Sequence, residues 1–268
     1  MYHQISAETF NIYRFLVPNS DRNIGYVLEC KNTKKCLIFD PLDKDIIDKI
    51  LDDNDLKPEY ILNTHAHPDH IKYNSYYLGK FKVKLLAHDM CKDLFDHEFD
   101  NIFENDVIKI GDLKLKVLHT PGHCPEHISI IADNYLFCGD TIFNCGVGNV
   151  HFRGNITMLF RTIHHKIKHL SNELIILPGH DYLQNNLSFL GNLISDSDPI
   201  IEELKTIESQ CLDNDLSPLK TISFEKKYNP FFRIDELSFL DILSDPKVFE
   251  TLTMEDRFIK LRSLRDKW

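Results

Sequence analysis

The densest group of side chains that could do chemistry is the segment Thr64-His65-Ala66-His67-Pro68-Asp69-His70, which directly follows a short apolar run. In an extended chain successive side chains alternate, so His65 and His67 face the same side and could hold one metal ion. Pro68 disfavours helix at His67 and keeps this pair extended. If a helix follows, Asp69 and His70 turn towards a neighbouring point. The segment therefore predicts metal ligation, and one loop could supply two metal centres.

Three further candidate ligands each follow a predicted strand. They are His123 in His119-Thr120-Pro121-Gly122-His123, Asp140 in Phe137-Cys138-Gly139-Asp140 and His180 in Pro178-Gly179-His180. Taken singly, each would more often be an ordinary loop residue, but their order after the first segment favours ligands. Imidazole and carboxylate ligands suit zinc, iron or manganese, so the ligand types do not name the metal.

This ligand set resembles that of the metallo-β-lactamase superfamily. The resemblance implies an α/β fold, an αββα sandwich with a two-metal site at one edge of its sheets. It implies that His65, His67 and His123 hold the first metal ion. The second would be held by Asp69, His70 and His180, and Asp140 would bridge the two. We expect two divalent ions, zinc with iron or manganese as alternatives, and catalytic roles for Asp69 and Asp140.

The C-terminal part of the chain narrows the resemblance to the glyoxalase II family. His180-Asp181-Tyr182 resembles that family's His-Glu-Tyr, and Asn185-Asn186-Leu187 resembles its Asn-Asn-Leu. Asn229-Pro230-Phe231-Phe232-Arg233 is similar to its Asn-Pro-Phe-Leu-Arg, and Arg262–Trp268 is similar to its Arg-x-x-Lys-Asp-x-Phe ending. These matches span nearly the whole chain. They imply a binuclear thioester hydrolase that cleaves S-D-lactoylglutathione to D-lactate and glutathione, a step of methylglyoxal detoxification. Metal-activated water would attack the thioester, and the thiolate leaves without a dedicated general acid.

A glutathione thioester carries two carboxylates, so its pocket needs local cations. Arg262 and Arg265, three apart on a predicted helix, lie on one face and could hold a carboxylate; a solvated helix end is the alternative. Tyr182 could donate its hydroxyl to the peptide backbone of the glutathione moiety, and Asn186 could add an amide contact. The alternative is that these two residues cap a helix or pack against neighbouring side chains.

Two departures from the glyoxalase II pattern affect the predicted substrate contacts. Arg265 stands where the family commonly has Lys, which keeps the charge but changes its geometry. The loop from 146 to 154 is one residue longer than usual, so Asn149 falls where a basic substrate ligand is expected. We expect Arg153 to supply that charge, with an exposed loop arginine as the alternative. His151 or Phe152 would take the place of the family's aromatic residue.

Short apolar runs bounded by turn residues predict the strands that position these residues, and longer periodic runs predict helices. The predicted strands are Tyr26–Cys30, Cys36–Phe39, Tyr60–Leu62, Lys84–Ala87, Val107–Ile110, Leu113–Leu118, Ile128–Ala132, Tyr135–Cys138 and Glu173–Leu177. The predicted helices are Asp45–Asp53, Ile156–Leu170, Asn185–Ile194, Pro199–Leu212 and Met254–Asp266. The change to helical periodicity predicts a catalytic domain over residues 1–182 and a helical substrate-binding domain over residues 183–268.

Composition limits the partners. The chain has 268 residues and a formal charge of −10, which disfavours a general nucleic-acid binder. Its seven cysteines form no CxxC pair, which favours a reducing compartment. No secretory signal is visible, and no apolar run approaches the ~20 residues that cross a bilayer. We expect a cytoplasmic protein, a monomer or weak dimer, whose partner is a small glutathione thioester.

Two other functions remain open. A persulfide dioxygenase with one iron would use the same fold, although His70 argues for two metal ions. A non-catalytic scaffold would also keep the fold, but such a protein should have lost some ligands. A β-lactamase or an RNA-processing nuclease fits less well, because the C-terminal motifs match neither.

Overall fold

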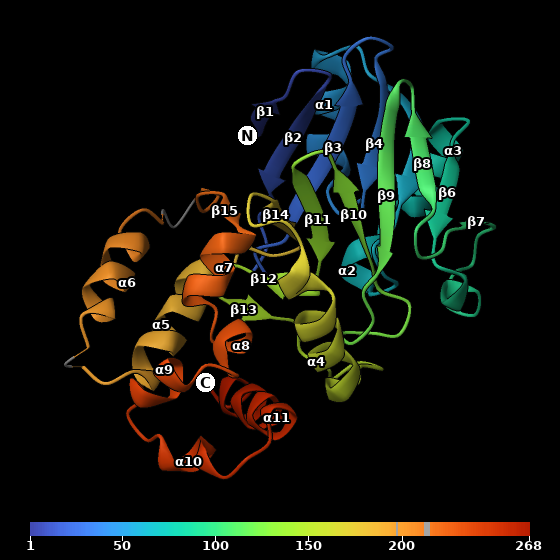
Figure 1. Cartoon of the computed structure of the whole chain (residues 1–268). Helices are drawn as coiled ribbons and strands as arrows, with labels where there is room; N and C mark the ends of the chain where they lie inside the picture. Colours follow the sequence, from blue (N-terminus) through green and yellow to red (C-terminus); the bar gives the residue numbers. More distant parts are fainter. Residues whose placement is uncertain (197, 212–214) are drawn as a thin grey trace. The chain divides into compact units, whose positions relative to one another are not determined.

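The computed structural model describes residues 1–196, 198–211 and 215–268, and the chain divides into two compact units (Figure 1). Unit 1 comprises Met1–Thr120 and Glu126–Gly139; unit 2 comprises Pro121–Pro125 and Asp140–Trp268. Each unit buries its own set of apolar side chains. Among the described residues, no helix is both long and apolar enough to cross a membrane.

A seven-stranded mixed sheet, in the order β1-β2-β3-β4-β5-β6-β7, forms one layer of unit 1. Strands β1 to β4 pair antiparallel, and β4 to β7 pair parallel. The bounds are β1 His3–Ser6, β2 Phe10–Leu16, β3 Ile24–Cys30, β4 Lys35–Phe39, β5 Lys57–Leu62, β6 Lys84–Ala87 and β7 Asp100–Asn101. Four of these strands confirm predicted ones, whereas β1, β2 and β7 were not predicted.

The second layer of unit 1 is an antiparallel meander in the order β8-β9-β10-β11. Its bounds are β8 Val107–Ile110, β9 Leu113–His119, β10 Ile128–Ala132 and β11 Tyr135–Gly139. Gly111 at φ 54° and Asp133 at φ 49° turn the two predicted hairpins, because such tight turns require positive φ. All four strands confirm the sequence prediction to within one residue.

The two layers of unit 1 pack through aromatic side chains. Phe39 stacks on Phe137 with ring centroids 4.1 Å apart, and Tyr26 meets Phe137 edge-on at 5.5 Å. Neighbouring strand residues face the other way, where α1 (Lys44–Asp53) and α3 (Asn74–Lys80) cover the seven-stranded sheet. Ile47 and Tyr77, both fully buried, anchor these helices. The shorter elements are α2 Pro68–Ile71 and the 3-10 turn η1 Asp89–Cys91.

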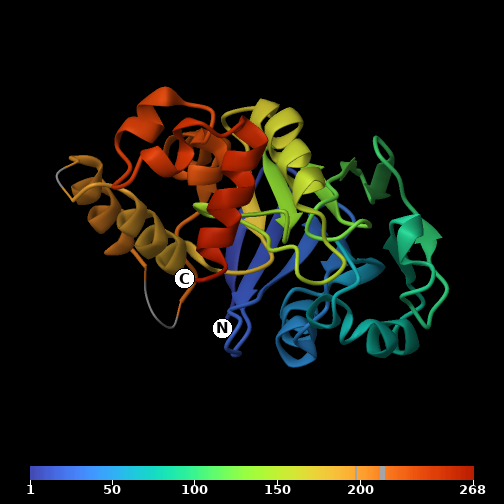
Figure 2. The same ribbon diagram turned by 90° about the horizontal axis from the view of Figure 1, so that it is seen from below.

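Unit 2 is mainly helical. Its strands form two antiparallel pairs, β12 (Ile142–Phe143) with β13 (Gly146–Val147) and β14 (Ile175–Pro178) with β15 (Lys220–Thr221). Its helices are α4 Ile156–His165, η2 Ile167–His169, α5 Leu183–Leu193, α6 Ile200–Glu208, α7 Ile222–Tyr228, α8 Pro230–Arg233, α9 Leu237–Asp241, α10 Lys247–Glu250 and α11 Met254–Arg265. Helices α4 and α11 lie side by side in Figures 1 and 2. The rings of Phe160 on α4 and Phe258 on α11 meet with centroids 5.5 Å apart.

The predicted helices of unit 2 are largely present, with one correction. Helices α5, α6 and α11 confirm three predictions, although Leu212, the predicted end of the second, lies outside the described residues. The single helix predicted over Ile156–Leu170 is wrong. Lys166 leaves the helical region at φ −127°, so α4 ends at His165 and a separate 3-10 turn follows.

Helix α11 begins and ends with residues that stabilise helix termini. Thr253 caps its start by accepting from the N–H of Asp256, and acidic residues occupy the first turn. Arg262 and Arg265 occupy the last turn, where cations interact favourably with the helix dipole. These terminal residues therefore stabilise α11 over the bounds that place both arginines in its last turn.

Candidate metal centre and adjoining cavity

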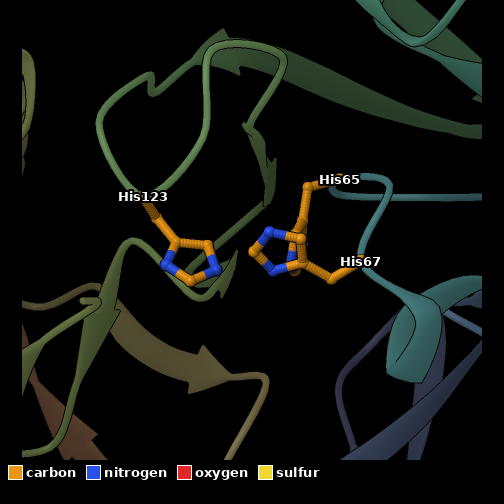
Figure 3. Close-up of side chains that lie close together, drawn as sticks. All are labelled: His65, His67 and His123. Atoms are coloured by element: carbon orange, nitrogen blue, oxygen red, sulfur yellow. The ribbon is translucent and has the colours of Figure 1, made fainter. Parts of the chain in front are cut away.

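The loop after β5 brings His65 and His67 together on one side (Figure 3). Nε2 of His65 lies 3.1 Å from Nδ1 of His67. His67 is extended at φ −72° and ψ 147°, and Pro68 occupies the first turn of α2. This confirms the expected local structure, in which two imidazoles face one point.

Helix α2 carries the next two candidate ligands of unit 1. Nε2 of His70 lies 3.6 Å from Oδ2 of Asp69, and the rings of His65 and His70 have centroids 4.0 Å apart. Asn23 donates to Oδ2 of Asp69 at 3.0 Å and so fixes its carboxylate. Unit 1 therefore gathers all four candidate ligands of the His65–His70 segment.

Asp40 supports this group and was missed by the sequence analysis. Its Oδ1 accepts from the Thr64 N–H at 2.7 Å, while Oδ2 lies 2.7 Å from Thr64 Oγ1 and 2.9 Å from Nδ1 of His70. Thr64 Oγ1 is in turn 3.0 Å from Nδ1 of His65. Metal-bound imidazoles usually have such a partner on the second nitrogen. The signal in the sequence was an aspartate at a strand end, directly before Pro41.

Unit 2 brings together the other three candidate ligands, which all have buried side chains. Nε2 of His180 lies 3.2 Å, and Nε2 of His123 3.6 Å, from Oδ2 of Asp140. His123 stands on the loop after β9 (Figure 3). Within this unit, the side chains of His123 and His180 therefore converge on Asp140.

The two histidines of unit 2 are also oriented through Nδ1. Nδ1 of His123 lies 2.7 Å from the carbonyl oxygen of Asn149, and Nδ1 of His180 lies 3.2 Å from the hydroxyl of Tyr182. Gly148 allows the loop that carries Asn149 to approach the main chain of Asp140 closely, because a Cβ there would lie 2.1 Å from the carbonyl oxygen of Asp140. The main chain at Asn149 therefore sets the position of the His123 ring.

The donor set fits divalent metal ions. In His65, His70, His123 and His180, an oxygen atom holds Nδ1, and Nε2 faces other candidate ligands of the same unit. This is the arrangement in which Nε2 ligates a metal ion and Nδ1 carries the proton. Imidazole nitrogens combined with carboxylate oxygens suit zinc, iron or manganese.

A cavity of about 230 Å³ adjoins the candidate ligands of unit 2 and is lined by Phe143, Val147, Asn149, His151, Tyr182, Asn186, Arg262, Arg265 and Asp266. Four of the five predicted substrate contacts are among these residues. Arg153, the fifth, is not among the described residues that line it; this arginine is exposed and has φ 63°. Asn149 lines the cavity in the place where the family pattern led us to expect a basic residue.

The two arginines of the cavity differ in their environment. Arg262 is 7% exposed; its NH1 donates to the carbonyl oxygen of Val147 at 2.9 Å, and its Nε and NH2 lie 3.0 and 2.9 Å from Oδ1 of Asp266. Burial lowers the pKa of Arg262 to about 10. Arg265 donates through Nε to Oδ1 of Asn186 at 3.2 Å, and burial lowers its pKa too. Asp266 thus compensates Arg262 directly, whereas Arg265 bonds to a neutral amide.

Replacing Asp40 by asparagine is expected to weaken metal affinity about 10- to 100-fold, the usual effect of losing such a supporting carboxylate. Metal titration against a competing chelator measures the change. Asp45→Ala is the control, because that side chain is 87% exposed on α1. Unchanged affinity in the Asp40→Asn protein would contradict a supporting role for this carboxylate.

Comparison with known proteins agrees with this architecture. The family model described as "Metallo-beta-lactamase superfamily" matches residues 23–181, and the one described as "Hydroxyacylglutathione hydrolase C-terminus" matches residues 181–268. Two curated hydroxyacylglutathione hydrolases are similar to the chain. The protein of Nitrosococcus oceani is 35% identical over 93% of this chain and 97% of its own, and that of Polaromonas sp. is 31% identical over 96% and 99%.

The similarity extends to solved structures. The B3 metallo-β-lactamase BLEG-1 superposes with a TM-score of 0.63 at 24% identity, over 87% of this chain and 99% of its own, and this likeness shows the fold. The family-model matches cover most of the chain, and the identity to curated relatives holds over nearly their whole length. The chain therefore belongs to the hydroxyacylglutathione hydrolase family, within the metallo-β-lactamase superfamily, and has its α/β fold with a C-terminal helical region.

Proposed function

We propose that this protein is a thioester hydrolase that cleaves S-D-lactoylglutathione to D-lactate and glutathione. The observation that carries the proposal is the position of the cavity in unit 2. Tyr182 and Asn149 line it and also contact the candidate ligands His180 and His123. A molecule bound in this cavity would therefore lie beside the candidate metal ligands. The curated relatives are hydroxyacylglutathione hydrolases, and this chain matches them over nearly their whole length. They support the same activity.

We propose further that both ligand groups serve one binuclear centre. His65, His67 and His123 would hold one ion, Asp69, His70 and His180 the other, and Asp140 would bridge them. The histidine and carboxylate donors of each unit support this assignment, with zinc as the metal and iron or manganese as alternatives. Bound divalent ions would supply an activated water at neutral pH and polarise the thioester carbonyl group.

The residues of the chain then orient the reactants. The carboxylate of Asp69, which Asn23 holds at 3.0 Å, would orient the attacking water towards the carbonyl carbon. The water oxygen, having lost one proton to solvent, would form a C–O bond to the carbonyl carbon. The C–S bond would then break with its electron pair on sulfur, which leaves as a thiolate, and the acid product would release its proton to solvent. Because a thiolate is a good leaving group near neutral pH, its departure requires no protonated side chain of the enzyme.

The cavity would hold the glutathione moiety. We propose contacts from Tyr182, Asn186, Arg262 and Arg265, which all line it. We also propose that residues 1–182 form the catalytic domain and residues 183–268 the substrate-binding domain; the two family models, which meet at residue 181, support this division. The cytoplasmic location and the monomeric or weakly dimeric state remain predictions.

The test is a turnover assay on purified protein whose metal content is measured on the same sample. Release of free thiol from S-D-lactoylglutathione, followed with a thiol reagent, is the expected result. Oxygen consumption with a glutathione persulfide would instead favour the dioxygenase alternative. Metal-loaded protein that releases no thiol would contradict the proposed function.

Replacing Arg265 by glutamate is expected to raise KM for this thioester about 10- to 100-fold and to change kcat little. The reason is that a repulsive carboxylate replaces a cationic donor that lines the cavity and whose hydrogen bond, among the described residues, goes to the neutral amide of Asn186. Arg257→Glu on the same helix is the control, because Arg257 does not belong to the residues that line the cavity. An unchanged KM in Arg265→Glu would remove Arg265 from the proposed substrate contacts.

A further inference from the structure

Unit 1 buries a carboxylate, beside its candidate metal ligands, to which the proposed function gives no role. Glu126 lies just before β10 and is 1% exposed. Its Oε1 accepts from the main-chain N–H of Ala66 at 3.3 Å. Ala66 stands between the candidate ligands His65 and His67, so this hydrogen bond holds the part of the chain that joins them.

The two residues after this glutamate fix its segment against the same loop. The Ile128 N–H donates to the carbonyl oxygen of Thr64 at 2.9 Å. The ring of His127 stacks on that of His65 with centroids 4.9 Å apart. Positions 126, 127 and 128 therefore contact positions 66, 65 and 64 in an antiparallel alignment. Because β10 is itself paired with β9, this segment gives the ligand loop a rigid support.

The Ala66 N–H depends on this acceptor. Ala66 is 9% exposed and packs with Ala87 and Cys91, so solvent does not reach the amide unless the loop moves. An unpaired buried N–H costs free energy, and the loop avoids that cost by turning the amide towards water. Such a turn would move both neighbouring imidazoles, whose facing nitrogens are 3.1 Å apart.

Other hydrogen bonds of the loop act before or after this pair of histidines. Asp40 accepts from the N–H of Thr64, which precedes the pair. Asn63 donates to the carbonyl oxygen of His70, which follows it. The bond from Ala66 to Glu126 acts between the two imidazoles, where it can set their spacing.

We propose that Glu126 is a positioning residue of the metal centre, whose carboxylate oxygen holds the Ala66 N–H and so sets the spacing of His65 and His67. This inference rests on the proposed function, because it concerns the ion that these histidines are proposed to hold. In this role the side chain serves as a hydrogen-bond acceptor, and a neutral amide oxygen in the same place would serve as well.

Titration of the full-length protein with Zn²⁺ against a competing chelator tests the assignment without turnover. Glu126→Met keeps the length of the side chain but removes the acceptor, and it is expected to bind Zn²⁺ about 10- to 100-fold more weakly than wild type. Glu126→Gln keeps an oxygen acceptor and is expected to stay within about threefold of wild type. If Glu126→Gln loses as much affinity as Glu126→Met, the hydrogen bond is not the cause and the proposal is overturned.

Glu126→Asp gives a second measurement, which decides the matter if Glu126→Met does not fold. It keeps the carboxylate but shortens its reach by one methylene group. It is therefore expected to weaken Zn²⁺ binding more than Glu126→Gln does. The opposite order would assign the effect to charge and overturn the proposal.

The visible spectrum of Co²⁺-loaded protein separates positioning from a loss of stability. The d–d bands of Co²⁺ depend on the arrangement of its ligands, so Glu126→Met is expected to change them and Glu126→Gln to leave them as in wild type. Urea unfolding of the metal-free proteins is measured alongside. A Glu126→Met protein that is less stable but keeps the Co²⁺ bands and the Zn²⁺ affinity of wild type would show that Glu126 supports only the fold, against the proposal.

Glu59→Met is the matched control. Oε2 of Glu59 also accepts a main-chain N–H of unit 1, from Gly111 at 3.4 Å, but that amide adjoins no candidate ligand. Its Zn²⁺ affinity is expected to equal that of wild type. Equal losses in Glu59→Met and Glu126→Met would reveal a general effect of removing a buried acceptor and overturn the specific role of Glu126.

The proposal and the proposed function fail in different ways. Metal-loaded wild-type protein that releases no thiol from S-D-lactoylglutathione contradicts the function, and the Zn²⁺ titration still decides the role of Glu126. Wild-type protein that hydrolyses this thioester, together with unchanged Zn²⁺ affinity in Glu126→Met, overturns the role of Glu126 and leaves the function standing.

Discussion

Replacing His65 and His67 together by alanine is expected to lower kcat/KM for S-D-lactoylglutathione by at least ~10³-fold. The two imidazoles face one point, with nitrogen atoms 3.1 Å apart. They are two of the three histidines proposed to hold the first metal ion. Activation of water and polarisation of a carbonyl by a metal ion contribute several kcal/mol to catalysis, and each ~1.4 kcal/mol corresponds to a tenfold change in rate. Loss of that ion therefore accounts for the expected decrease.

Metal content separates this loss from unfolding. The double variant is expected to bind less metal than wild type while keeping its circular dichroism spectrum, because Asp40 and Asn63 still hold the loop through Thr64 and the His70 carbonyl. The matched control is His165→Ala combined with His169→Ala, since both histidines are exposed on unit 2. Full activity of the His65 and His67 double variant would rule out the proposed metal mechanism.

The sequence predicted the strands and helices that carry the candidate ligands better than it predicted the side chains that hydrogen-bond to these ligands. The strands before His65, His123 and His180 are short apolar runs, whose period and turn residues are local signals. Strands β1 and β2 lacked such a signal, because polar residues such as Arg14 interrupt their buried pattern.

The contacts that orient the ligands depend on the tertiary fold. Asp40 contacts His70 from the end of a strand that lies far away in the sequence. Its φ of 40° is a backbone conformation that the sequence pattern did not predict. His151 and Asp266 meet across more than a hundred residues for the same reason. By contrast, the i to i+4 spacing of Arg262 and Asp266 on a predicted helix was a local signal for their ion pair.

The choice of Arg153 as a substrate contact shows a further limit. Charge made it the natural replacement for a missing basic residue, but charge alone does not tell which way a loop residue turns. In the structure Arg153 has φ 63° and is exposed, whereas His151, two positions earlier, lines the cavity. A shift of two residues along a turn therefore decides which side chain lines the cavity.

Glu225 is expected to make the stability of this protein fall as the pH rises from about 5 to 9. Its side chain on α7 is fully buried, and Oε2 accepts from the Cys145 N–H at 2.9 Å and from Nδ2 of Asn229 at 2.9 Å. Asn229 also donates to the carbonyl oxygen of Gly146 at 3.0 Å, so these side chains fix the β12–β13 turn, where Cys145 has φ 59°. Burial raises the pKa of Glu225 from 4.5 to about 8.

The sign of the effect follows from proton binding. Between pH 4.5 and about 8 the folded protein keeps a proton on Glu225 that the unfolded chain has released. Stability falls with pH wherever the folded state binds more protons, and the loss is complete above the folded-state pKa. A rise of the pKa from 4.5 to about 8 corresponds to a loss on the order of 4–5 kcal/mol in the free energy of unfolding.

Glu225→Gln isolates this contribution, because glutamine resembles the protonated acid in shape and cannot ionise. Urea unfolding at pH 5, 7 and 9 is expected to show that the free energy of unfolding of Glu225→Gln, relative to wild type, rises by several kcal/mol with pH. Titration of the histidines changes both proteins alike, so the difference between them cancels it. Glu250→Gln, an exposed residue of α10, should show no such trend. A difference that stays constant from pH 5 to 9 would mean that Glu225 is ionised in the folded protein, with its carboxylate stabilised by the two N–H donors.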